Sequence, residues 1–163
     1  MKQSPVQLLE NTLLKSIVVP LPKSMIDSAA DLNLQHATSF RSFPDFWSDE
    51  EQSEAVRANT FLVRLALRTA PKIVQPAPYS FELIYSGIVL VLPSSTNKVE
   101  EYALQYGLSL LAGSIRETLL GITARMNHGE YVLPTLSFMD ESPEEVKTNP
   151  QIEGALSPPR EEK

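Results

Sequence analysis

The second half of the chain reads FELIYSGIVLVLP over residues 81–93, YALQYGLSLLAGSIRETLLGITARMN over 102–127 and HGEYVLPTLSF over 128–138. Apolar residues are almost continuous in the first piece after Glu82, which predicts a strand over 79–92 with both faces covered. Gly87 inside this strand indicates a bulge or a close backbone approach. The three pieces carry no catalytic chemistry and hold more apolar surface than one small domain needs. They therefore favour oligomerisation and protein binding.

The second piece has a single apolar stripe. Its members recur at steps of four and three residues: Leu104, Leu108, Leu111, Ile115, Leu119 and Ile122. This spacing predicts an amphipathic helix over 99–126, about 40 Å long at 1.5 Å per residue. Such a helix is longer than a small sheet. Its apolar stripe therefore either packs only in the core of the single chain or also contacts a second subunit. The residues that we expect at that contact are Leu108, Leu111, Ile115 and Leu119.

Three more strands are predicted before this unit, over Val6–Val19, Asp31–Thr38 and Thr60–Thr69. The third has the clearest alternation, because every second residue from Phe61 to Leu67 is apolar. The first contains two leucine pairs, at 8–9 and 13–14, which place apolar groups on both of its faces. Either a β-bulge or a second partner surface would explain these pairs.

The composition is that of one soluble domain. The chain has 163 residues, 42% of them hydrophobic, and no cysteine, which excludes disulfides and thiolate chemistry and suits a reducing compartment. We recognise no signal peptide and no run of the roughly 20 apolar residues that span a bilayer, so we expect a cytoplasmic protein without membrane insertion. We assign 1–139 to a single domain and 140–163, which is acidic and proline-rich, to a disordered tail.

The net charge of −6 comes mostly from that tail, where seven acidic residues stand against three basic ones. The remaining body is close to neutral and shows no basic stripe, so we expect no nucleic-acid binding. Only two histidines are present, His36 and His128, and neither has a partner at ligand spacing. The chain contains no nucleophile, phosphate-loop or dinucleotide motif. We therefore expect neither an enzyme nor a cofactor or metal.

An aromatic segment, FRSFPDFWSDEEQSE, lies in a predicted loop over 39–56. Its four aromatic residues are Phe40, Phe43, Phe46 and Trp47. They either tie the loop to the domain's own core or form the wall of a binding groove. For the second case we predict a polypeptide-binding surface made with the extended stretch 131–138, consisting of Phe43, Phe46, Trp47, Tyr131, Leu133, Leu136 and Phe138.

The order of these elements resembles the SecB protein-export chaperone family. The resemblance rests on SGIVLVLP, a polar start to the helix, LLAGSIRETLLGITAR and a short extended stretch into LPTLSF. Gly87, the Arg116–Glu117 pair, Arg125 and Phe138 keep the family's spacing without a gap. It covers about 79–138 in motif detail and about 6–138 in element order.

The resemblance implies an α+β fold in which a four-stranded antiparallel sheet precedes the long helix. It also implies a homotetramer, assembled as a dimer of dimers with the long helices packed between dimers. The implied function is ATP-independent holding of unfolded or precursor polypeptides, followed by their delivery to the SecA motor. Shallow apolar contacts suit a protein that must bind many sequences.

The sequence departs from the family pattern in two places. The segment MDESPEEVKTNPQ after the extended stretch offers no second amphipathic helix. SecA docking in the family uses acidic residues on the exposed sheet face, and Glu82 matches one such position. The corresponding first-strand positions hold Lys15, Ser16, Val19 and Pro20. An alternative is therefore a dedicated chaperone or adaptor for one partner, such as an antitoxin, without SecA docking.

Overall fold

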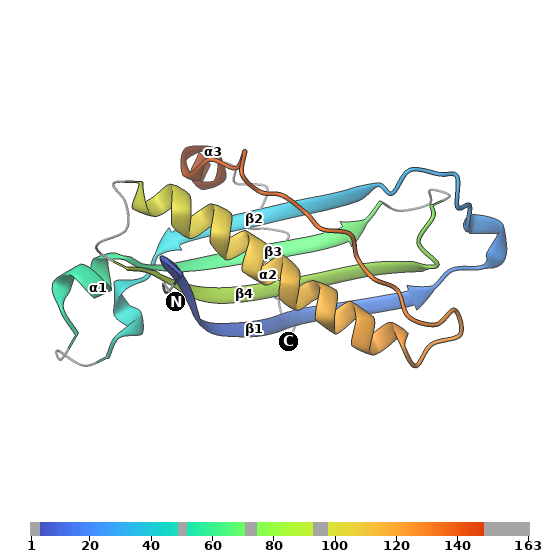
Figure 1. The fold of residues 1–163 in the computed structure, drawn as a ribbon, viewed down its shortest axis with the longest axis horizontal. Helices are drawn as coiled ribbons and strands as arrows, with labels where there is room; N and C mark the ends of the chain where they lie inside the picture. The colour runs from blue at the N-terminus through green and yellow to red at the C-terminus, as the bar shows by residue number, and fades with distance from the viewer. Residues whose placement is uncertain (1–3, 49–51, 71–74, 93–97, 149–163) are drawn as a thin grey trace, which may run out of the picture.

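The computed structural model describes residues 4–48, 52–70, 75–92 and 98–148. Four strands form one antiparallel sheet in the order β1-β4-β3-β2 (Figure 1). Their bounds are β1 Val6–Pro20, β2 Leu34–Ser42, β3 Thr60–Thr69 and β4 Tyr79–Val91. The long helix α2, Val99–Thr123, crosses one face of the sheet diagonally. The predicted fold class, a four-stranded antiparallel sheet followed by a long helix, is confirmed.

The alternation in β3 separates two faces of the sheet. Phe61, Val63, Leu65 and Leu67 are buried against α2, on what we call the helix face. Strand pairing places the intervening residues of all four strands on the opposite side, which we call the open face. Its members include Lys15, Ile17, Gln35, Ala37, Ser39, Arg41, Leu62, Arg64, Ala66, Arg68, Glu82, Ile84, Ser86 and Ile88.

Two glycines let α2 approach the sheet closely. A Cβ on Gly87 of β4 would lie 2.8 Å from Leu111 Cδ2, and a Cβ on Gly107 of α2 would lie 3.1 Å from Val63 Cγ2. The prediction of a close backbone approach at Gly87 is therefore confirmed. The helix ends at Thr123, three residues earlier than predicted, and Gly129 takes a φ of 78° in the turn that follows.

The paired leucines of β1 mark two bulges. The register with β4 shifts between Leu8 and Glu10 and again between Leu13 and Lys15. Each shift inserts one extra residue, so one leucine of each pair is accommodated without a partner opposite it. The structure thus shows the bulge, and Leu13 and Leu14, at 41% and 48% exposure, also keep side-chain surface for a partner.

Strand β2 begins and ends later than predicted. Its pairing with β3 runs to Ser42, and Phe40 is buried on the helix face with its ring 5.1 Å from that of Phe61. The assignment of Phe40 to a loop was therefore wrong. The prediction failed because the polar residues Ser39 and Arg41 lie on the open face, where polarity does not oppose a strand.

The segment after α2 runs back over the helix face and ends in a short helix, α3, Pro143–Thr148 (Figure 1). Val146 is buried, and α3 packs against β2. Gln105 Nε2 donates hydrogen bonds to the carbonyl oxygens of Met139 (2.7 Å) and Glu141 (3.3 Å). Residues 140–148 are therefore ordered, which corrects that part of the predicted disordered tail. The rest of the tail, 149–163, lies outside the described residues.

Three short helices complete the described chain: η1, Lys23–Met25, η2, Pro44–Phe46, and α1, Glu54–Ala58. Helices η2 and α1 lie at the same end of the sheet (Figure 1). Helix η2 lies within the aromatic segment, and α1 begins at the last residue of that segment. Ser53 caps α1, because its hydroxyl accepts a hydrogen bond from the backbone N–H of Val56.

Candidate functional site

The apolar stripe of α2 belongs to the core of the single chain. Leu108, Leu111, Ile115 and Leu119 all have 0% exposure and lie in the hydrophobic cluster with β3 and β4. A side chain without exposed surface has none left for a second subunit. The structure therefore shows the core-only alternative for these four residues and corrects their assignment to a subunit contact.

The extended stretch after α2, residues 129–138, is fixed to the helix face by polar contacts. Arg116 donates from Nε to the carbonyl oxygen of Leu133 (2.8 Å) and from a terminal nitrogen to Thr135 Oγ1 (3.1 Å). The Tyr79 hydroxyl donates to the carbonyl oxygen of Gly129 (2.8 Å), and Thr123 Oγ1 accepts from the N–H of Tyr131 (2.9 Å). Arg116 thus holds the extended stretch in place, a role that the sequence did not predict.

Four predicted binding residues lie on this stretch, and they divide into two kinds. Leu133 and Phe138 are buried in the chain's own core and offer no surface to a partner. Tyr131 and Leu136 are half-buried and pack against that core. The Tyr131 ring lies 6.4 Å from the ring of Phe81, and burial raises its pKa above the ordinary value of 10.0.

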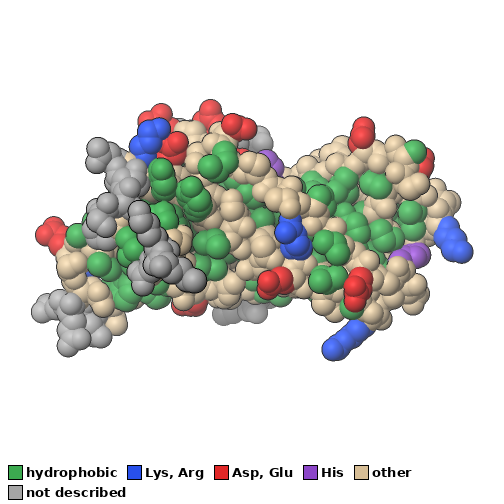
Figure 2. Space-filling model, in the orientation of Figure 1, with side chains coloured by type: hydrophobic (Ala, Val, Ile, Leu, Met, Phe, Trp, Pro, Cys, Tyr) green, Lys and Arg blue, Asp and Glu red, His purple; other side chains and the backbone are tan. Residues whose placement is uncertain are grey.

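An apolar band remains accessible around Tyr131 and Leu136. We define this band by five residues, of which Val132 is 59% exposed and the others are partly buried: Val18, Leu34, Tyr131, Val132 and Leu136. Figure 2 shows hydrophobic side chains gathered over the half of the helix face that the extended stretch crosses. The band offers contact area with few directional hydrogen bonds, which suits a ligand of variable sequence.

The aromatic segment lies at one end of the open face. Trp47 Nε1 donates a 2.8 Å hydrogen bond to Thr60 Oγ1, and Thr60 pairs with Leu90 of β4. The Phe46 ring meets the Trp47 ring edge-on at 4.9 Å, and the Arg41 guanidinium lies 5.2 Å from the centre of the Phe43 ring. We call Phe43, Phe46 and Trp47 the aromatic cluster. These contacts tie its loop to the sheet.

The seven predicted binding residues therefore do not form one surface. The aromatic cluster is on the open face, whereas the residues at 131–138 are on the helix face. Glu82 also lies on the open face, as the resemblance implied, and its carboxylate is 2.7 Å from Lys15 Nζ. Sequence reasoning could not separate the two groups, because the face of the aromatic loop depends on the strand pairing of Thr60.

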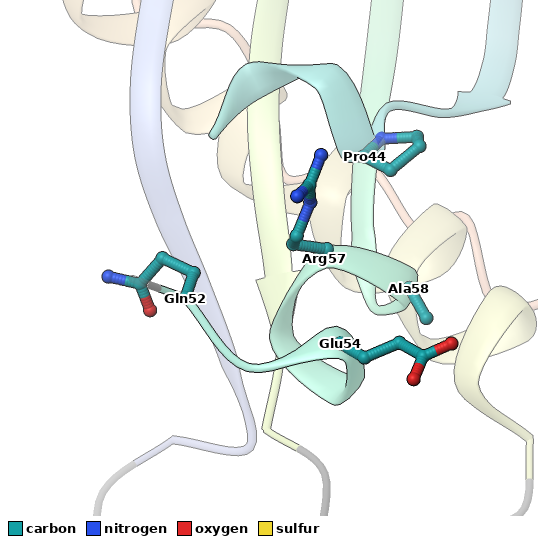
Figure 3. Close-up of a pocket in the computed structure, with 5 residues that line it drawn as sticks. All are labelled: Pro44, Gln52, Glu54, Arg57 and Ala58. Carbon is teal, nitrogen blue, oxygen red and sulfur yellow. The ribbon is translucent and has the colours of Figure 1, made fainter. Parts of the chain in front are cut away.

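An open pocket of about 420 Å³ lies between η2 and α1 (Figure 3). Its walls are Pro44, Gln52, Glu54, Arg57 and Ala58, and the Glu54 carboxylate points away from Arg57. The pocket thus lacks a convergent pair of titratable groups of the kind that acid–base catalysis requires. Across the described part of the chain, no three His, Asp or Glu side chains gather to hold a metal ion.

Strand β1 carries further accessible apolar side chains, which the sequence analysis did not place in the binding surface. Leu13, Leu14, Ile17 and Val19 are 41–50% exposed on a 15-residue edge strand. Tyr106 and Leu110 are also exposed, on the outer side of α2. The pattern of apolar residues along the chain could not reveal this exposure, because it depends on the position of β1 at the edge of the sheet.

Among the described helices, none has the length and apolarity needed to cross a membrane.

The fold is shared with a chaperone of known structure. The chain is similar to a SecB-like chaperone of Mycobacterium tuberculosis, solved in complex with a ChAD peptide from the HigA1 antitoxin: TM-score 0.51, 19% identity, 81% of this chain and 91% of that one. It is also similar to a Streptococcus agalactiae protein of unknown function: TM-score 0.45, 10% identity, 79% and 96% covered. No protein-family model and no curated protein matches the sequence. The resemblance to the SecB family is thus confirmed for the fold, and the chain is divergent in sequence.

Proposed function

We propose that this protein is an ATP-independent chaperone that holds unfolded or precursor polypeptides in the cytoplasm. The observation that carries the proposal is the fold shared with a SecB-like chaperone over 81% of the chain. That protein was solved with a bound peptide, so this fold is compatible with polypeptide binding. The apolar band on the helix face supports the proposal, because a chaperone needs accessible apolar surface that does not select one sequence.

We propose the apolar band as the client-binding surface. Its central residue is Val132, which is 59% exposed between the half-buried side chains of the extended stretch. Val132→Asp should reduce binding of an unfolded client, because a carboxylate would have to lose water against apolar client side chains. Met139→Asp is the matched control, since Met139 is 55% exposed but lies beyond the band. Equal losses in the two variants would contradict this location.

The sequence analysis also placed the aromatic cluster in the polypeptide-binding surface. Trp47 is half-buried and hydrogen-bonded to Thr60, which supports a structural role in the loop. Trp47→Ala distinguishes the two roles: client binding lost more than stability would favour a groove, and equal losses would show that Trp47 only anchors the loop.

The direct test of the holding activity is suppression of aggregation. A chemically unfolded protein is diluted into buffer with or without a several-fold molar excess of this chain, in the absence of ATP, and light scattering is followed. We expect slower scattering growth and release of a folding-competent client. Unchanged scattering at that excess would overturn the proposed function.

A dedicated chaperone for one partner is the second candidate. Docking to SecA in the family uses acidic residues on the open face. Here Glu82 is paired with Lys15, and the corresponding first-strand positions, Lys15, Ser16, Val19 and Pro20, are not acidic. The similar chaperone was solved with an antitoxin peptide, which supports a single dedicated client. Affinity purification from the native host that returns one stoichiometric partner would favour this candidate, and a broad set of unfolded proteins together with SecA would favour the general one.

A further inference from the structure

The open face holds three arginines that have no acidic partner among the residues that the structure describes. Arg41, Arg64 and Arg68 lie on the neighbouring strands β2 and β3, and no carboxylate of the described residues is within 4.0 Å of any of them. Arg68 Nε instead donates to Gln35 Oε1 at 2.9 Å. Arg64 Nε is buried without a hydrogen-bond partner among the described residues. A buried donor on a charged group that stays unpaired is costly. Because the chain itself covers Nε, an acceptor from outside can meet only the other nitrogens of this guanidinium.

The surroundings of Arg64 can receive such an acceptor. Strand register places Ser39, Arg64, Ser86 and Thr12 in one row across the sheet, so hydroxyl groups flank the guanidinium on both sides. On the two central strands, the row on one side holds Leu62 and Ile88, and the row on the other side holds Ala66 and Ile84. On β3 and β4, apolar pairs therefore flank the pair of Arg64 and Ser86, whereas the outer strands add Arg41, Glu10 and Lys15 to these rows.

A small hollow of about 70 Å³ lies next to this row. It is lined by Gln35, His36, Ala37, Ala66, Arg68 and Glu82. The two alanines leave room between the longer polar side chains, so an apolar side chain of modest size can enter there. Glu82 is the acidic group in the lining, and the 2.7 Å contact with Lys15 compensates its charge.

The charge of the open face is opposite to that of the chain. Lys15, Arg41, Arg64 and Arg68 stand against Glu10 and Glu82 on the four paired strands, whereas the whole chain carries −6. A face of this sign attracts an acidic partner, and it does not repel the protein's own neutral clients. The apolar side chains of β3 and β4 beside the arginines favour a polypeptide over a nucleic acid, whose phosphates repeat without apolar groups between them.

We propose that the open face is a docking surface for an acidic polypeptide segment bound in an extended conformation. Arg64, Ala66 and Arg68 point to the same side of β3 at every second residue. An extended segment lying along β3 matches them with a carboxylate at position i, a small apolar side chain at i+2 and a second carboxylate at i+4, roughly 13 Å from the first. The Arg64 guanidinium then gains an opposite charge next to its terminal nitrogens, although its buried Nε stays out of reach. This inference does not depend on the proposed client-binding function.

The test uses a nine-residue synthetic peptide with glutamates at i and i+4 and valine at i+2, together with a copy in which glutamine replaces both glutamates. Binding to the full chain is followed through the NMR signals of the arginine Nε–H groups, which detect weak association. We expect the Arg64 and Arg68 signals to shift with the glutamate peptide and not with its glutamine copy. The double variant R64Q/R68Q should weaken binding about tenfold, whereas R57Q/R125Q, with the same change in charge, should not.

Three results would overturn the docking surface: equal binding of both peptides, equal binding by R64Q/R68Q and the native chain, or a single-stranded oligonucleotide that shifts the same signals at lower concentration. The R64Q/R68Q variant should also suppress client aggregation as the native chain does, because the apolar band lies on the other face. A parallel loss of suppression would instead show that the open face belongs to the client site. If the native chain does not suppress aggregation but still binds the glutamate peptide, the proposed function is wrong and the docking surface stands.

Discussion

The contact between α2 and the sheet is set by single residues, and Gly107 is the most restrictive of them. A Cβ at this position would lie 3.1 Å from Val63 Cγ2 and 3.2 Å from Val89 Cγ2. Both valines are fully buried and, being β-branched, have a restricted χ1, so neither can move aside at low cost. Gly121 in the same helix has no atom within 4 Å of the corresponding point.

These two glycines should respond to alanine in opposite directions. Gly121→Ala should raise the free energy of unfolding by about 0.5–1 kcal/mol, the usual gain for alanine over glycine in a helix. Gly107→Ala gains the same helical contribution but overpacks the interface by about 1–3 kcal/mol, so it should lower the free energy of unfolding. Urea unfolding followed by circular dichroism measures both. Equal gains would show that α2 shifts freely on the sheet.

Arg64 should reduce the stability of the isolated chain, because its buried Nε has no hydrogen-bond partner in the described part of the chain. Arg64→Met keeps an unbranched apolar side chain and removes the unpaired donor, so we expect it to raise the free energy of unfolding by about 1 kcal/mol. Arg68→Met is the control, since Arg68 loses a hydrogen bond to Gln35 and should gain nothing. A lower stability of Arg64→Met than of Arg68→Met would mean that Arg64 already has a stabilising role in the free protein.

Among the helices and strands, the sequence predicted those with a continuous pattern of buried apolar residues. Strands β3 and β4 and helix α2 each have one continuous apolar pattern that is buried in the core between the helix and the sheet, and their predicted bounds lie within three residues of the observed ones. The end of β2 and the helix α3 were missed. In both, a single buried residue, Phe40 or Val146, is surrounded by polar residues that face solvent or the open face. One apolar residue in a polar context gives no periodicity to detect.

Helix α3 should detach as a unit when its one buried side chain is made polar. Val146→Asp places a carboxylate where the side chain is buried against β2, at a cost that a helix of six residues cannot offset. We expect amide hydrogen exchange across 140–148 to become at least about tenfold faster, with β4 amides unchanged. Asp140→Asn, at an exposed position of the same segment, is the control. Unchanged exchange in Val146→Asp would show that the Gln105 and Glu141 contacts suffice to hold α3.

At the scale of the molecule, the candidate site was the part least accessible to sequence reasoning. The residue types were informative, because half-buried aromatic side chains occur in the aromatic segment, and the exposed Val132 lies in the extended stretch. Their grouping was not, since the face on which a loop lies is decided by strand order and register. The same reason applies to Leu111 and Ile115, whose partners are strands of the same chain.

The exposed edge of β1 is the surface that we expect to join two copies of the protein in a homo-oligomer. A long edge strand with exposed apolar side chains pairs readily with another strand, so we expect a solution mass well above 18.1 kDa. The double variant L14K/I17K should lower that mass to the protomer without unfolding it, because both side chains are nearly half exposed. Multi-angle light scattering measures the mass, and Met139→Lys is the control. A monomeric native chain would contradict the assembly.

The position of β1 in the sheet also has a kinetic consequence. Strands β2, β3 and β4 follow one another and pair as neighbours, whereas β1 pairs with β4 across the whole length between Val6 and Val91. Closing so long a loop is slow, so the meander β2-β3-β4 should assemble before β1 joins it. Pulse-labelling hydrogen exchange during refolding should protect β3 amides before β1 amides, and the reverse order would contradict this sequence of events. During its own synthesis, the apolar strand made first would then be among the last to be sheltered, which exposes the nascent chain to aggregation.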